Sequence, residues 1–161
     1  MSEIREPEML TIAAAMAESS RLATDTASLD VELLLCHVLE CDRVYLRTWP
    51  DRALNAAQAR SFLALLEKRI KGLPIAYLIG SRDFWSLNLA VNEHTLIPRP
   101  DTEVLVERGL ELDLGTQASV LDLGTGTGAI ALALASERPR WKVVGVDCFD
   151  AVVSLAKASI T

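Results

Sequence analysis

Long hydrophobic runs are missing from this sequence of 161 residues. The longest uninterrupted apolar run is Ala129–Ala135, much shorter than the roughly 20 residues that a membrane-spanning helix needs. The first residues, M-S-E-I-R-E-P-E, are acidic and contain no apolar segment of the kind found in a secretory signal. We therefore expect a cytoplasmic protein that does not use a membrane as a partner.

Cysteines and basic clusters are also scarce. Cys36, Cys41 and Cys148 are odd in number and share no C-x-x-C spacing, which predicts packing thiols in a reducing compartment and no metal site. The formal net charge is −6, and lysine and arginine form no run. This charge argues against direct binding of nucleic acid as the main substrate, and it suits a basic protein partner better.

Residues 1–75 have the pattern of a helical bundle. Met9–Ala17 is an alanine-rich amphipathic segment, and Ser28 stands where an N-cap residue would, before acids and then a leucine run. His37 lies in the apolar part of this second helix, and we interpret it as a packing or surface histidine because no metal-ligand spacing accompanies it. Trp49-Pro50 marks a break between helices.

A third helix has clear limits in the sequence. Asn55 is its predicted N-cap, and Gly72 followed by Pro74 ends it. Its apolar face consists of Phe62, Leu65, Leu66 and Ile70. The bundle offers no catalytic constellation, so we expect it to recognise a partner.

Residues 76–98 have the pattern of a linker that contains a β-hairpin. Leu87–Val91 alternates between apolar and polar residues, and Asn92-Glu93 offers a turn before Thr95–Ile97. Two prolines then follow in P-R-P-D-T-E, residues 98–103. Pro100 can be the first residue of a helix, whose apolar positions are Val104, Leu105, Leu110 and Leu112.

The most informative segment is residues 118–147. An apolar run ends in Asp122, the loop Gly124-Thr125-Gly126-Thr127-Gly128 follows, and a second apolar run ends in Asp147. Closely spaced glycines let backbone N–H groups approach a ligand, and an acid after the next strand can bind a ribose diol. Ile130, Leu132 and Leu134 alternate as in a strand, but alanine content and position after the loop favour a helix.

Two cofactor classes fit this segment. Gly124-x-Gly126-x-x-Ala129 satisfies the dinucleotide fingerprint of nicotinamide-dependent oxidoreductases, whereas acid-x-Gly-x-Gly-x-Gly is the pattern of S-adenosyl-L-methionine sites. Asp122 favours the second class, because a carboxylate would repel a pyrophosphate lying over the loop but not a sulfonium cofactor. A purely structural glycine turn would leave the acids after both strands unexplained.

Four motifs occur together in this chain: G-x-P-I-A-Y-L-x-G, D-F-W-S-L, T-L-I-P-R-P-D-T-E and V-L-D-L-G-T-G-T-G-A-I-A-L-A-L-A. In combination they closely resemble the release factor glutamine methyltransferases, over about residues 30–155. The resemblance implies an α + α/β architecture: an N-terminal helical bundle, a hairpin linker, and the start of a Rossmann-like methyltransferase domain from residue 99. It also implies methylation of the glutamine amide in the G-G-Q motif of peptide chain release factors, which are the expected partners in translation termination.

Carried over to this chain, the resemblance gives roles to individual residues. Gly124 to Gly128, including Thr125 and Thr127, would lie against the methionine part of S-adenosyl-L-methionine. Asp147 would take the ribose hydroxyls, and Asp122 would order the loop or a water near the cofactor's amino group. Arg99 to Glu103 would sit beside the pocket without an assigned contact.

One family motif does not occur in these 161 residues, the N-P-P-Y segment that positions the substrate amide. We therefore expect a truncated member of the family that contains the cofactor half of the site and no catalytic residue of its own. We also expect the isolated chain to expose apolar strand faces at Val120, Leu121, Val143, Val144 and Val146. A non-catalytic module that binds release factors stays open as an alternative, beside an oxidoreductase fragment.

Overall fold

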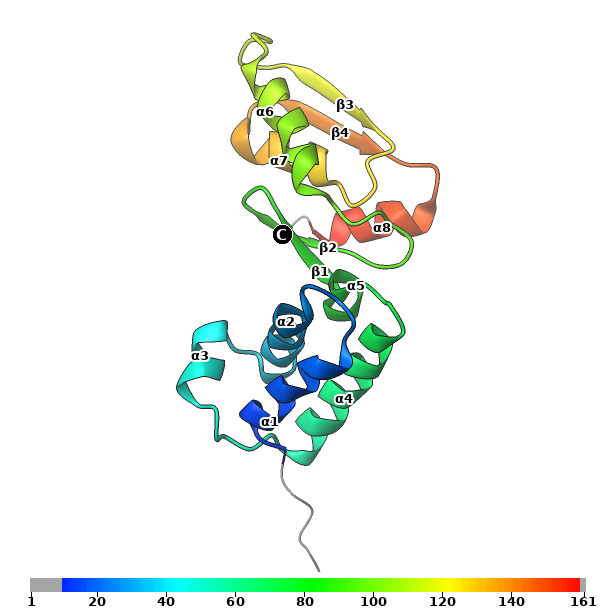
Figure 1. Ribbon diagram of the computed structural model, residues 1–161. Coiled ribbons are helices and arrows are strands. Elements are labelled where there is room, and N and C mark those ends of the chain that lie inside the picture. The colour runs from blue at the N-terminus through cyan, green and yellow to red at the C-terminus, as the bar shows by residue number, and fades with distance from the viewer. Residues whose placement is uncertain (1–9, 160–161) are drawn as a thin grey trace, which may run out of the picture. The chain divides into compact units, whose positions relative to one another are not determined.

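The computed structural model describes residues 10–159, and the chain divides into two compact units, one ending at Ile79 and one beginning at Gly80. Over its described residues, 10–79, the first unit is built from helices, with one isolated β-bridge between Thr11 and Ala53 (Figure 1). Its elements are α1 Ile12–Ala17, the 3₁₀ turn η1 Glu18–Arg21, α2 Ala27–Leu39, α3 Arg43–Thr48, α4 Ala56–Ile70 and α5 Ile75–Ile79. The division falls somewhat later than residue 75, because α5 packs against α2 and α4.

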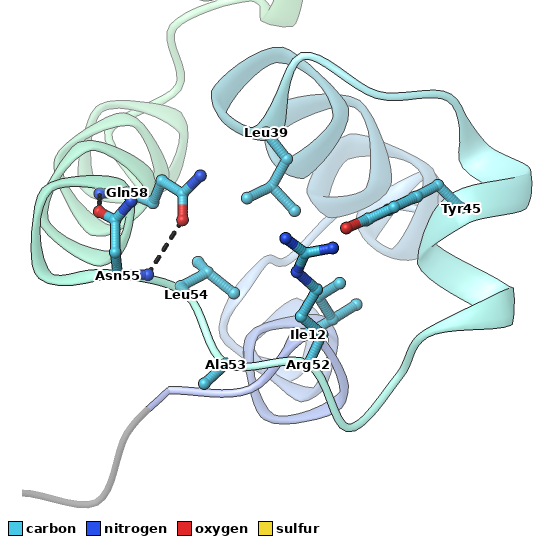
Figure 2. Close-up of a pocket in the computed structure, with 8 residues that line it drawn as sticks. All are labelled: Ile12, Leu39, Tyr45, Arg52, Ala53, Leu54, Asn55 and Gln58. Atoms are coloured by element: carbon cyan, nitrogen blue, oxygen red, sulfur yellow. Dashed lines mark hydrogen bonds between the residues drawn. The ribbon is translucent and has the colours of Figure 1, made fainter.

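The start of α4 confirms the predicted N-cap. The Asn55 side chain accepts hydrogen bonds from the backbone N–H groups of Ala57 and Gln58, each at 2.9 Å, and Gln58 Oε1 accepts the Asn55 N–H at 2.9 Å (Figure 2). This reciprocal capping box satisfies N–H groups that the first helical turn leaves without a partner. At the other end, Gly72 adopts a left-handed φ of 94°, as a glycine that ends a helix commonly does.

Other helix limits differ from the prediction. Met9 lies outside the described residues, and α1 begins at Ile12 behind Thr11, whose side chain caps it. Ser28 is not an N-cap: α2 begins at Ala27, because a turn at Thr24–Ala27 and the Asp30 N–H bond to Thr26 start the helix earlier. The short helix α3, capped by Asp42, was not predicted from the sequence.

The core of the first unit lies between α1, α2 and α4. Its fully buried side chains are Ile12, Ala15, Val31, Leu34, Leu35, Phe62 and Leu66. Of the predicted face of α4, Phe62 and Leu66 are buried, whereas Ile70, in the last turn, is 39% exposed. His37 is exposed, as a surface histidine.

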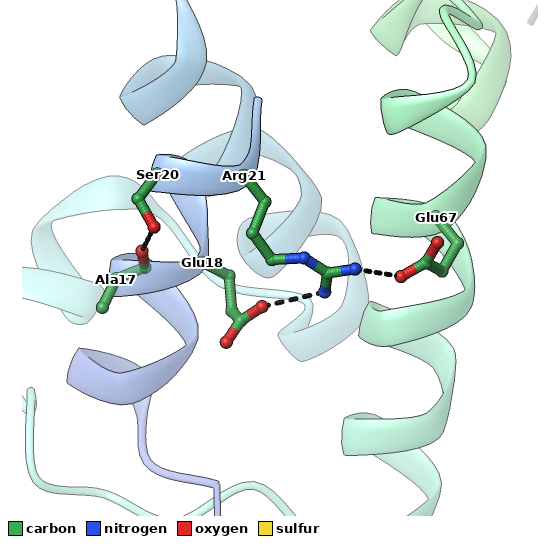
Figure 3. Close-up of polar contacts among 5 residues, drawn as sticks. All are labelled: Ala17, Glu18, Ser20, Arg21 and Glu67. Carbon is green, nitrogen blue, oxygen red and sulfur yellow. Dashed lines mark hydrogen bonds and ion pairs between the residues drawn. The ribbon is translucent and has the colours of Figure 1, made fainter. Parts of the chain in front are cut away.

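Two ionic contacts join α4 to the rest of this unit. Asp30, only 5% exposed, accepts a hydrogen bond from Arg69 Nε at 2.8 Å. At the surface, Arg21 pairs with Glu18 at 2.9 Å and also with Glu67 of α4 (Figure 3). The exposed pair contributes little to stability, whereas the buried pair is costly to break because either partner alone would be an unpaired charge.

The second unit begins with an antiparallel hairpin of β1 Ser81–Phe84 and β2 Leu87–Ala90. The predicted hairpin was therefore wrong in its partner: Asn92–Thr95 does form a turn, with Thr95 N–H bonded to the Asn92 carbonyl at 3.1 Å, but no strand follows it before α6. The actual hairpin turn is at Trp85-Ser86, where Trp85 has a φ of 56°. Such turns normally carry glycine or asparagine, which is why the sequence did not reveal this one.

The rest of the second unit is a β-α-β crossover with flanking helices. Its elements are η2 Pro100–Thr102, α6 Glu103–Glu111, β3 Ser119–Leu123, α7 Ala129–Glu137, β4 Lys142–Val146 and α8 Asp150–Ala158. Strands β3 and β4 are parallel, from Ser119↔Lys142 to Leu123↔Val146, so their carboxyl ends meet at one edge. Residues 130–134 are helical, and Pro100 opens the turn that continues as α6, as predicted.

Helix α7 covers one face of the parallel pair, and α6 packs on α7 (Figure 1). The hairpin residues Phe84 and Leu89 join Val106, Ala133 and Trp141 in one core. The predicted apolar positions of α6 were wrong for three residues: Val104, Leu105 and Leu112 are 50%, 59% and 58% exposed, while Val106 is fully buried. Leu110 does pack against this core.

The parallel pair has one covered and one open face. Val120 and Val143 pack against the core, so the expectation that they would be exposed was wrong, since α7 covers them. Leu121, Val144 and Val146 are 59%, 41% and 40% exposed, as predicted, and Leu123 is 74% exposed.

Candidate functional site

The glycine loop lies at the carboxyl ends of β3 and β4, between β3 and α7. Gly124, Gly126 and Gly128 have φ values of 71°, 56° and 81°, in the left-handed region that residues with a Cβ adopt only with strain. No heavy atom outside the neighbouring residues lies within 4 Å of the place where a Cβ would be at Gly124 or Gly126. These two glycines thus leave room for close approach of a ligand to the backbone.

Backbone hydrogen bonds tie the loop to the end of β4. The N–H groups of Gly124 and Thr125 both donate to the Val146 carbonyl at 2.9 Å, and Gly128 N–H donates to the Thr125 carbonyl at 2.9 Å. In addition, Thr125 Oγ1 donates to Asp122 Oδ2 at 2.8 Å. Asp122 therefore holds the Thr125 side chain in the loop that follows it.

Asp147 reaches the loop from the end of β4. Its Oδ2 accepts the Gly126 N–H at 3.1 Å and its Oδ1 accepts the Phe149 N–H at 3.3 Å. The bond from Gly126, followed by those from the two residues after Asp147, lowers the pKa of this carboxyl below its ordinary value. A carboxylate offers about four lone pairs, so an ionised Asp147 can accept further hydroxyl groups while it stays bonded to the loop.

The end of the loop is part of the packing of the unit. Thr127 as a whole residue is only 3% exposed, so little of its side chain or its backbone is open to a ligand. A Cβ on Gly128 would stand 3.1 Å from Leu132 Cδ1 and 3.5 Å from the Ala156 Cβ. Gly128 also precedes α7 without a side-chain cap, which leaves the first N–H groups of that helix to other partners.

Gly145 supports the loop and was missed by the sequence analysis. A Cβ on this residue of β4 would stand 2.6 Å from Thr125 Oγ1 and 3.0 Å from Thr125 Cβ. Gly145 is paired in the sheet with Asp122, the partner of the same threonine hydroxyl. A glycine in a strand interior is a recognised sign of close approach, and it is the signal that could have identified this position.

The P-R-P-D-T-E segment stabilises the hairpin. Glu103 Oε1 accepts the Trp85 N–H at 2.9 Å, and Glu137 Oε1 of α7 accepts the Trp85 indole N–H at 2.7 Å. Two carboxylates therefore hold the residue with the strained positive φ. No hydrogen bond or ion pair joins Arg99–Glu103 to the glycine loop within the described part of the chain.

Metal ligands, membrane-spanning helices or reactive cysteines among residues 10–159 would point to other functions. No group of histidine, cysteine and acidic residues could hold a metal ion there, and none of the helices is long and apolar enough to cross a membrane. Cys36 and Cys41 pack against the first core, and burial raises the pKa of the Cys36 thiol to about 11, so it is protonated at neutral pH. Cys148 is exposed, so its interpretation as a packing thiol was wrong.

Comparison with known families covers most of the chain. Residues 10–80 match a family described as the PrmC N-terminal domain, and residues 114–161 match a methyltransferase domain. The first match spans the helical unit, and the second contains the glycine loop and Asp147.

Individual relatives are similar over almost the whole chain. The release factor glutamine methyltransferase of Shewanella oneidensis is 52% identical over 139 residues, which are 86% of this chain and 49% of that protein. The proteins of the same name from Pseudomonas aeruginosa and Vibrio cholerae are 49% and 48% identical over 92% of the chain, and it covers 54% and 52% of them. The chain thus spans about half the length of the curated relatives it matches.

Proposed function

Because the chain belongs to the family of the release factor glutamine methyltransferases, we propose that it forms the methyl-donor half of such an enzyme. The reaction is transfer of a methyl group to the side-chain amide of the glutamine in the G-G-Q motif of a peptide chain release factor. The donor is S-adenosyl-L-methionine, and the place of action is the cytoplasm, where translation terminates. The geometry of the glycine loop with Asp147 is the observation that carries this proposal.

The residues present fit this cofactor. Gly124 and Gly126 leave open space over a backbone in the left-handed region, where the methionine part of the cofactor can lie close to the chain. Asp147 keeps free lone pairs for the two ribose hydroxyls after bonding Gly126. Asp122 places a carboxylate next to the loop, which suits the cationic amino group of the cofactor and would repel a pyrophosphate.

Methyl transfer to an amide requires a positioned acceptor nitrogen as well as a bound methyl donor. When bound beside Gly124, Gly126 and Asp147, the cofactor would supply an electrophilic methyl group on its sulfonium for transfer to the amide nitrogen. An amide nitrogen is a poor nucleophile, so catalysis depends on holding it in line. No N-P-P-Y segment for that task occurs in residues 1–161, and we propose that this chain by itself transfers no methyl group.

The helical unit would then hold the protein substrate. Its described residues contain no group that could hold a metal ion and no cysteine with a lowered pKa. The family that it matches is described as an N-terminal domain. A role in binding the release factor accounts for a folded unit without chemistry of its own.

The test uses the complete product of the gene that encodes these residues, purified release factor and S-adenosyl-L-methionine labelled in its methyl group. We expect label at the glutamine amide and no binding of NAD in a calorimetric titration. Replacing Asp147 by alanine should weaken cofactor binding about ten- to hundredfold, through loss of charge-assisted hydrogen bonds.

Asp113, an exposed acid outside the site, is the matched control, and Asp113→Ala should change cofactor affinity by less than about twofold. Saturable binding of NAD in place of S-adenosyl-L-methionine would overturn the proposed activity. If the Asp147 and Asp113 variants bind S-adenosyl-L-methionine with equal affinity, Asp147 is not part of the cofactor site, and the proposed activity is unaffected by that result.

A further inference from the structure

A cavity of about 230 Å³ opens in the helical unit, between the start of α1, the end of α2, α3 and the start of α4. Figure 2 shows its lining, with the Arg52 guanidinium lying among the side chains of Leu39, Tyr45 and Leu54. It is smaller than the roughly 300–1,000 Å³ of ordinary small-molecule sites. A single side chain of a protein partner is the kind of occupant it can take.

The Arg52 guanidinium is free to bind an anion. Its guanidinium carbon lies 5.5 Å from the centre of the Tyr45 ring, and this stacking leaves the N–H edges of the guanidinium open. Unlike Arg21, Arg43 and Arg69, which have carboxylate partners, Arg52 forms no ion pair within residues 10–159. A stacked arginine loses little further freedom when a carboxylate binds it by two N–H groups.

Hydrogen bonds fix the backbone around Arg52. Its carbonyl accepts the Ile12 N–H at 3.0 Å, Leu54 N–H donates to the Leu10 carbonyl at 2.8 Å, and Ala53 forms a β-bridge with Thr11. The segment that carries the arginine is therefore tied to the start of α1. Ile12 and Leu54, 1% and 4% exposed, give the cavity an apolar side.

The opposite side of the cavity is polar. The Gln58 side chain stands over it with Oε1 engaged by the Asn55 N–H, so its amide nitrogen is the part with hydrogens to donate. The N-terminus of α4, a helix of 15 residues, begins at the same place and adds a favourable field for a negative charge. The nearby acid Asp42 is engaged in capping α3, with its Oδ1 accepting the Tyr45 N–H at 2.8 Å.

We propose that this cavity, the Arg52 pocket, binds the carboxylate of a glutamate side chain on the protein substrate. The apolar side takes the methylene groups, while Arg52 and Gln58 take the two carboxylate oxygens. The identity of the partner rests on the proposed function, since the release factor is the protein substrate there. The pocket itself rests only on the geometry of the helical unit.

The first experiment tests the pocket without a release factor. Nitrogen-15 NMR spectra of the 161-residue chain are recorded during titration with N-acetyl-glutamate methylamide, and with the glutamine analogue as its neutral counterpart. We expect saturable shifts at Arg52 Nε–H, Leu54 and Gln58, with a Kd on the order of millimolar for so small a probe, and no saturation with the glutamine analogue. Equal responses to both probes, or none to either, would overturn the proposal.

Two variants sharpen this test. Arg52→Gln should abolish the response, and Arg60→Gln should keep it, because Arg60 is an exposed arginine of α4 outside the pocket. If Arg52→Gln proves unfolded in its own spectrum, the comparison of the two probes on the unaltered chain still decides the question.

The second experiment uses the complete gene product and a release factor. Arg52→Gln should raise KM for the release factor about tenfold with kcat and cofactor affinity unchanged, while Arg60→Gln should leave all three unchanged. An unchanged KM in the Arg52 variant would overturn the partner assignment. Complete absence of methyl transfer by the unaltered protein would instead refute the proposed function, and the probe titration would still decide whether the pocket binds a carboxylate.

Discussion

Gly145 lies in β4, next to the glycine loop, and replacing it by alanine should disrupt that loop. The backbone of Gly145 is not in the left-handed region, so alanine is acceptable there in itself. The added Cβ, however, would meet Thr125 Oγ1 at 2.6 Å and Thr125 Cγ2 at 3.1 Å. The threonine must rotate or move away, and it then loses its 2.8 Å hydrogen bond to Asp122.

The magnitude follows from these contacts. Forcing an extra methyl group into a packed place costs about 1–3 kcal/mol, and a lost hydrogen bond to a charged group costs about 1.5–3 kcal/mol. Alanine reduces the freedom of the unfolded chain and so returns about 0.4–1 kcal/mol. Since the carboxylate is only partly buried, we expect Gly145→Ala to lower the free energy of unfolding of the second unit by about 2–4 kcal/mol.

Urea denaturation followed by tryptophan fluorescence measures this change. Trp49 is in the first unit and is 57% exposed, so a Trp49→Phe background leaves Trp85 and Trp141 as reporters of the second unit. Gly109→Ala is the matched control, because there the Cβ meets only the flexible end of Leu134 at 3.2 Å. That helical glycine should accept alanine with a change within about 1 kcal/mol.

A double-mutant cycle isolates the cause. In a Thr125→Ala background two of the three obstructing side-chain atoms, Oγ1 and Cγ2, are gone, so Gly145→Ala should cost much less there. If it costs the same in both backgrounds, contact with the threonine is not what destabilises the variant, and the role assigned to Gly145 is wrong.

Two further predictions concern charged groups. Because the hydrogen bond from Gly126 lowers the pKa of Asp147, the bond stabilises the loop fully above the ordinary value of 3.8 and is lost as the pH falls through the lowered pKa. The Gly126 amide shift should therefore titrate with a midpoint below 3.8, and a midpoint at or above 3.8 would contradict the contact. Arg69→Met should lower the free energy of unfolding of the first unit by about 3–5 kcal/mol, since it leaves the buried Asp30 carboxylate unpaired. Adding Asp30→Leu should recover much of that loss in a thermal melt, and a single variant as stable as the unaltered protein would contradict the buried-pair argument.

The features that the sequence predicted correctly depend mainly on neighbours along the chain. The capping box of Asn55, the glycine at the end of α4, and the order strand, glycine loop, helix, strand are of this kind. Capping, left-handed glycines and alanine-rich helices involve residues within a few positions of one another. For the same reason, the glycine loop and the acids Asp122 and Asp147, which follow the two parallel strands closely, could be placed from the spacing of residues alone.

Where the prediction failed, contacts between distant segments decided the outcome. The hairpin turn at Trp85 has no glycine, and carboxylates from α6 and α7 hold it. The apolar pattern of α6 also suggested Val104 and Leu105, but the packing of α7 buries Val106. Neither partner segment is adjacent in sequence to the residue that it constrains.

The sequence by itself determined the helical and β-α-β segments and the family resemblance, and it indicated the residues proposed to meet a methyl donor, because all of these depend on local patterns and motifs. Only the tertiary structure showed that Gly145 must lack a side chain beside Thr125, that Asp30 is buried with Arg69, and that Arg52 stacks on Tyr45 in a cavity. Each of these depends on which side chains from separate elements come within a few ångströms, and that distance is fixed by packing and not by spacing along the chain.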